Sequence, residues 1–149
     1  MANIKWATPT SVATLLDTSL DDLAIAGEAE SADYVNTNND LYADFELVVC
    51  YATAPAAGVK AAELYLLPKL DGTNLPSVTS SGLPQKALLI GALESVLPST
   101  TVAERLVLLG VSIPPGTFRI RLSNTSGQAY KNNTVAKTLK IRPYQLQSA

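Results

Sequence analysis

Residues 102–123 read VAERLVLLGVSIPPGTFRIRLS, and this stretch decides the fold class. In its second half Phe118, Ile120 and Leu122 alternate strictly with polar or charged residues, so one face is apolar and the other is polar and faces solvent. A period of two is typical of a β-strand and does not fit a helix. The Pro-Pro-Gly sequence at 114–116 lacks two backbone donors, so we predict a turn there, at the rim of a sheet.

The alternating pattern recurs in three further segments, at residues 41–53, 59–67 and 134–142. In the first of these Asp44 and Glu46 fall on the outward face, together with Tyr42, Val48 and Cys50. The opposite face is formed by Ala43, Phe45, Leu47, Val49 and Tyr51. These segments are predicted to be strands, and the Gly, Pro, Asn and Asp residues between them are predicted to form turns and loops.

Together the strands predict an all-β, single-domain antiparallel β-sandwich, because two apolar sheet faces must cover each other. A jelly roll is the preferred topology. Residues 1–22 are expected to form an extended N-terminal arm, and residues 23–149 the sandwich domain. A strand is expected at 23–35 and a long surface loop at 69–84.

Two of the predicted strands, at residues 85–96 and 102–113, are apolar on both faces. In a sheet with one solvated face, only the inward-facing residues need to be apolar. The additional outward-facing apolar residues therefore suggest a subunit interface or a covering arm. The alternative is that loops of the same chain bury it. The candidate subunit-interface residues are Leu88, Ile90, Leu106 and Leu108.

The net charge of −2 is unevenly distributed. Residues 1–100 hold four lysines against twelve acidic residues, a net charge of −8, whereas residues 101–149 hold seven basic residues against one glutamate, a net charge of +6. A basic surface for nucleic acid is one interpretation. We favour the other, in which acidic early strands lie beside basic late strands, because no aromatic residues are interleaved with the basic ones.

Few residues could carry chemistry. The chain has no histidine, which removes the commonest general base and most zinc sites. Cys50, the single cysteine, has no imidazole partner and is interpreted as a small apolar filler or a masked surface thiol. Asp44 and Glu46 could serve as the acidic pair of a glycosidase or, with Asp40, as ligands of a calcium site. Ordinary acidic residues on the solvent-facing side of a strand give the same sequence pattern. We expect no catalytic residue, no metal and no cofactor. The single cysteine and the lack of a signal sequence favour folding in a reducing cytoplasm.

Several strand and turn motifs stand out: DLYADFEL at 40–47, LYLLP at 64–68, DGTN at 71–74, IPPGTF at 113–118 and LKIRPY at 139–144. Together these motifs resemble those of a family of small virion proteins of tailed bacteriophages. The resemblance implies a structural role, as a jelly-roll cement or decoration protein on the capsid exterior.

The leading hypothesis is therefore a non-enzymatic, homotrimeric cement protein that binds the major capsid protein and bridges capsomers, without contacting nucleic acid or membrane. It would be folded and assembled in the host cytoplasm. A second hypothesis is a tail or fibre module that binds host-surface glycan through tyrosines. The available tyrosines are Tyr34, Tyr42, Tyr51, Tyr65, Tyr130 and Tyr144. A third hypothesis, an enzyme acting on cell-wall polymer, requires Asp44 or Glu46 as acid or base.

Overall fold

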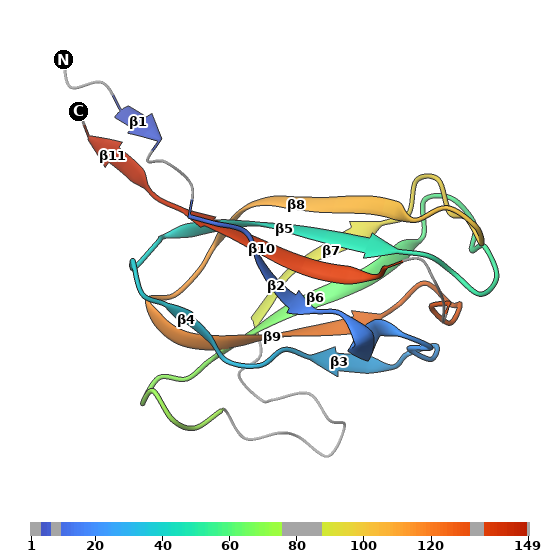
Figure 1. The fold of residues 1–149 in the computed structure, drawn as a ribbon, viewed down its shortest axis with the longest axis horizontal. Helices are drawn as coiled ribbons and strands as arrows, with labels where there is room; N and C mark the ends of the chain where they lie inside the picture. Colours follow the sequence, from blue (N-terminus) through green and yellow to red (C-terminus); the bar gives the residue numbers. More distant parts are fainter. Residues whose placement is uncertain (1–3, 7–9, 76–87, 132–135, 149) are drawn as a thin grey trace.

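The computed structural model describes residues 4–6, 10–75, 88–131 and 136–148 of the chain. Two antiparallel sheets pack face to face as a β-sandwich, and a two-stranded ribbon projects from one end (Figure 1). The strands are β1 (Ile4–Trp6), β2 (Ala13–Leu16), β3 (Glu28–Glu30), β4 (Tyr34–Asn36), β5 (Tyr42–Val49), β6 (Lys60–Pro68), β7 (Leu88–Glu94), β8 (Glu104–Ser112), β9 (Gly116–Asn124), β10 (Thr138–Tyr144) and β11 (Leu146–Ser148). Among the described residues the only helical segment is a single 3₁₀ turn, Thr18–Leu20.

The first sheet has the strand order β2-β10-β5-β8, and in the second β9 pairs with both β3 and β4 and is followed by β6 and β7. Apart from the step from β6 to β7, each connection between β4 and β10 crosses from one sheet to the other. The all-β sandwich predicted from the alternating patterns is thus confirmed. We interpret this strand order as a jelly roll.

The core lies between the sheets, where alternation along the strands places the apolar residues. In β9 the side chains of Phe118, Ile120 and Leu122 are fully buried, as the pattern predicts. The same holds for Phe45 in β5 and Ile141 in β10. The Pro-Pro-Gly turn carries the chain from β8 in the first sheet to β9 in the second.

The N-terminal segment differs from the prediction of an arm at residues 1–22. Residues Ala13–Leu16 form β2, which pairs with β10 at the edge of the first sheet. Leu16 and Leu20 are buried in the core, so this part of the chain belongs to the sandwich. Of the described residues in this segment, those of β1 lie outside the sandwich, paired with β11 in the projecting ribbon (Figure 1).

The strand expected at 23–35 is broken into β3 and β4. Between them the Ser31 N–H donates to the Ile120 carbonyl, and the Ser31 hydroxyl accepts from the Ile120 N–H. A side-chain oxygen thus replaces a backbone partner at the break. Of the loop expected at 69–84, the part from residue 76 onward lies outside the described residues.

Candidate subunit interface

The four predicted interface residues do not share one exposed face. Leu88 is 59% exposed, at the start of β7. Ile90 and Leu108 are half-buried and pack against the core. Leu106 is only 5% exposed and is part of the core, so its assignment to an outward face is wrong.

A β-bulge in β8 explains this error. Ala43 of β5 pairs with Val111, whereas Phe45 pairs with Leu108, so β8 has one residue more than β5 between these two pairs. Gly110 within the bulge has a φ of +70°, a conformation that favours glycine. The extra residue reverses the inward and outward faces. A glycine inside an otherwise regular strand pattern was the available sequence signal.

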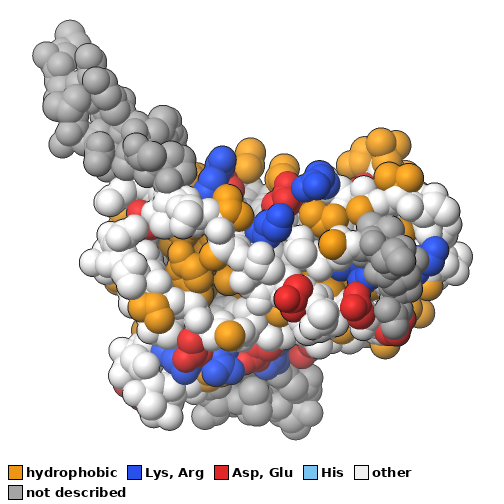
Figure 2. All heavy atoms as spheres, in the orientation of Figure 1, with side chains coloured by type: hydrophobic (Ala, Val, Ile, Leu, Met, Phe, Trp, Pro, Cys, Tyr) orange, Lys and Arg blue, Asp and Glu red, His pale blue; other side chains and the backbone are white. Residues whose placement is uncertain are grey.

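The outward apolar set is therefore a different one, which we name the β8 surface. Its members are between 57% and 78% exposed, and they are Val12, Val96, Leu97, Val102, Val107 and Leu109. Shallow hollows join them. Val12, Val107 and Leu109 line one of about 210 Å³, Val96 and Val107 line a second, and Val96, Leu97 and Val102 line a third. In Figure 2 hydrophobic side chains stand out along the upper rim, where Figure 1 places β8 and the loop before it.

The loop between β7 and β8 is held in place by a buried carboxylate. Glu104 is 8% exposed, and its side chain accepts a 2.6 Å hydrogen bond from the Ser95 hydroxyl. It also accepts from the backbone N–H groups of Val96 and Leu97. The Tyr51 hydroxyl lies 3.5 Å away, at the limit of a hydrogen bond. Since charge-assisted bonds to buried carboxylates are strong, the backbone at Val96 and Leu97 is fixed.

The far side of this loop is anchored as well. The Ser99 carbonyl accepts from the Tyr51 N–H, and the Ser99 hydroxyl oxygen accepts from the N–H groups of Thr101 and Val102. The Lys131 ammonium donates to the carbonyl of Thr100. The loop is thus held by polar bonds on both sides while three of its apolar side chains face solvent.

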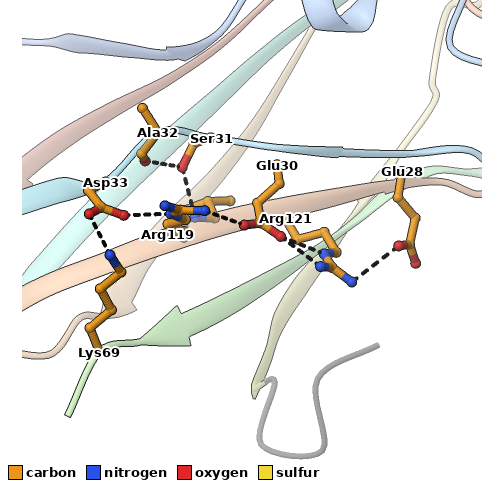
Figure 3. A network of polar contacts seen from close by, with 9 residues as sticks. Glu28, Glu30, Ser31, Ala32, Asp33, Lys69, Arg119 and Arg121 are labelled. Atoms are coloured by element: carbon orange, nitrogen blue, oxygen red, sulfur yellow. Dashed lines mark hydrogen bonds and ion pairs between the residues drawn. The ribbon is translucent and has the colours of Figure 1, made fainter. Parts of the chain in front are cut away.

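The outer face of the second sheet is organised differently, by ion pairs (Figure 3). Arg119 contacts Glu30 at 2.9 Å and also Asp33. Arg121 contacts Glu30 at 2.6 Å and Glu28 at 3.3 Å. The glutamates come from β3, Asp33 from the segment after it and the arginines from β9, so the predicted neutralisation of early acidic residues by late basic ones is confirmed.

These contacts shift the pKa values of the network. Burial alone would raise the pKa of Glu30, but hydrogen bonds from Arg121 and Arg119 outweigh burial and lower it. Hydrogen bonds from Lys69 and Arg119 likewise lower the pKa of Asp33. The carboxylates are therefore held in their charged form.

The outward acidic pair of β5 is also engaged. Asp44 accepts hydrogen bonds from the Arg142 guanidinium at 2.7 Å, the Gly110 N–H at 3.0 Å and the Tyr144 hydroxyl at 3.2 Å. Burial would raise the pKa of Asp44, but these bonds lower it, which is unfavourable for a general acid. Glu46 forms an ion pair with an arginine of β8. Among the described residues no three His, Cys, Asp or Glu side chains converge on a point that could hold a metal.

The remaining candidate groups have structural partners. Cys50 is fully buried, and its thiol lies 3.4 Å from the Ser99 carbonyl, as expected for an apolar filler. Asp40 accepts from the Thr10 hydroxyl at 2.9 Å. Asp71 accepts from two backbone N–H groups that follow it, which makes its Asp-Gly sequence a tight turn.

Two of the six tyrosines are unavailable to a glycan. Tyr51 and Tyr130 are fully buried and pack edge to face, and the Tyr130 hydroxyl donates to a backbone carbonyl. Tyr42 and Tyr144 are half-buried and stack at a ring-centroid distance of 6.0 Å. This stacked pair lies beside Asp44 on the first sheet.

Comparisons of the chain with known protein families, with curated proteins and with solved structures found no match. None of the helices described in the structure is long and apolar enough to cross a membrane.

Proposed function

We propose that this protein is a non-enzymatic structural protein of a virion, a cement protein that binds the outside of a phage capsid and bridges capsomers. The observation that carries the proposal is the β8 surface, a rigidly held group of exposed apolar side chains on a β-sandwich. Exposed apolar patches that the protein itself holds in place are typical of protein contacts. The phage assignment comes from the resemblance of the strand and turn motifs.

The proposed mechanism is adhesive. Each copy contacts the major capsid protein and other copies of itself, in a homotrimer, so that expansion of the head must break many contacts at once. Neither nucleic acid nor membrane takes part. The sandwich supplies a rigid support, because the inner strands β5 and β9 bury their inward side chains in the core and hold the exposed edge in position.

A second candidate function is favoured by the stacked pair Tyr42 and Tyr144. Two half-buried aromatic rings beside the carboxylate of Asp44 offer stacking and hydrogen bonding to a sugar. A tail-associated module that binds host-surface glycan would use this place. Loss of glycan-array binding in Tyr144→Ala, with binding kept in Tyr34→Ala, would favour it.

Immunogold labelling tests the proposal. An antibody against the purified protein is applied to intact phage particles from the source culture. We expect gold over the heads. Gold confined to the tails would contradict the cement function and favour glycan binding, and particles without gold would contradict both.

A further inference from the structure

We propose that the β8 surface binds a second copy of this chain, with Glu94 of one copy opposite Arg105 of the other. This inference deepens the proposed function, because it names the surface through which copies of the cement protein associate, and it rests on that function for its biological meaning.

The first argument is the rigidity of the surface. The Glu104 carboxylate fixes the backbone N–H groups of Val96 and Leu97, and their side chains are 66% and 78% exposed. A buried charge is costly to desolvate, yet here it orders a loop that displays apolar groups to water. A surface that is ordered in advance loses less entropy when a partner packs against it.

The second argument is charge. Glu94 on β7 and Arg105 on β8 line the same hollow of about 380 Å³, together with apolar residues. Arg105 is exposed and bonds Glu46 at 3.0 Å, whereas no described residue forms an ion pair or hydrogen bond with the Glu94 carboxylate. One wall of the hollow therefore carries an acidic side chain, and the other carries Arg105, whose side chain is 66% exposed although it also contacts Glu46.

These charges select a second copy as the occupant. In a two-fold pair, and equally in a closed ring, the acidic wall of one copy can face the basic wall of another. The surface is thus complementary to itself. A partner of a single charge sign would meet a like charge on one of the two walls.

The two strands that border the hollow, β7 and β8, lie close together. A Cβ atom at Gly91 of β7 would lie 2.5 Å from the Leu108 side chain of β8, so the two strands pack closely here.

Size-exclusion chromatography with light scattering tests the surface. We expect the wild-type protein to show a mass that is a multiple of 15.7 kDa. Leu97→Ser is expected to raise the dissociation constant at least tenfold, because it removes an exposed apolar group from the contact. Leu70→Ser is the matched control. Leu70 is 83% exposed and follows the opposite end of β6 from the loop, so this variant should associate as the wild type does. A wild-type mass of 15.7 kDa at high concentration, or equal effects of the two variants, would overturn the proposal.

A charge exchange tests the pairing. Glu94→Arg and Arg105→Glu are each expected to weaken association, and the double variant to restore it. Because both residues are exposed, neither change should prevent folding, which thermal unfolding checks. A double variant as weak as the single ones would overturn the pairing.

The two proposals fail in distinguishable ways. Gold on phage heads with a monomeric protein in solution would overturn the self-association, the homotrimer included, but not the binding to the capsid. An associating protein that is absent from virions would overturn the proposed function alone.

Discussion

The outer face of the second sheet and the β8 surface lie on one sandwich but differ in where their side chains find partners. On the first, Arg119 and Arg121 reach acids of β3 and of the segment after it, and the charges are neutralised within the chain. On the second, the apolar side chains of Leu97 and Leu109 are exposed. The charged side chains of the second sheet find their partners within one copy. We infer that the apolar side chains of the β8 surface are covered only when a second copy binds.

The largest expected effect is at the loop that supports the β8 surface. Glu104→Ala should lower the free energy of unfolding by about 3 kcal/mol, because it leaves the buried Ser95 hydroxyl and two N–H groups without their acceptor. Urea denaturation measures this. Glu94→Ala, which removes an exposed carboxylate from the adjoining strand, is the control and should change stability by less than about 0.5 kcal/mol. Equal losses would mean that the carboxylate does not hold the loop.

A smaller effect is expected on the charged face. Arg121→Ala should cost about 1.5 kcal/mol, since the Arg121 side chain is only 12% exposed and contacts two glutamates. Lys60→Ala removes an exposed pair with Glu63 and should cost less than about 0.5 kcal/mol. Chemical denaturation of both variants checks the difference, and a Lys60 effect as large as that of Arg121 would contradict it.

The smallest effect is one of pH. Because the pKa of Glu30 in the folded protein lies below its ordinary value of 4.5, the Glu30 carboxylate stabilises the fold above that pH, and this stabilisation is lost as the pH falls through the lowered pKa. Glu30→Gln should therefore flatten the acid side of the stability profile. Leu109→Gln, on the β8 surface, should leave its slope unchanged. Urea denaturation between pH 7 and about pH 2 measures both, and parallel profiles for wild type and Glu30→Gln would refute the assignment.

The sequence predicted the strands whose pattern is regular. Phe45 and Ile120 lie in strands that alternate without interruption where they cross the core, so their burial could be predicted from spacing alone. Leu106 could not be placed in this way, because the bulge at Gly110 reverses the faces of β8 and only the pairing with β5 reveals it. Short strands such as β2 are also invisible to periodicity, since four residues carry too little pattern.

The sequence predicted that an exposed apolar surface exists, but not which residues form it. Its existence follows from an excess of apolar residues in two strands. The bulge at Gly110 turns Val107 and Leu109 outward, and Glu104 holds the loop at Val96 and Leu97 through contacts that sequence spacing does not encode.

The position of β10 has a consequence for how the chain folds during synthesis. β10 lies between β2 and β5, and Leu139 pairs with Leu16, so the first sheet cannot close until residues 138–144 have been made. At about 5–20 residues per second, synthesis from β2 to β10 takes roughly 6 to 25 s. During this time β2 has no neighbour and β5 has an open edge. The nascent chain therefore spends seconds with unpaired strands and needs protection from aggregation.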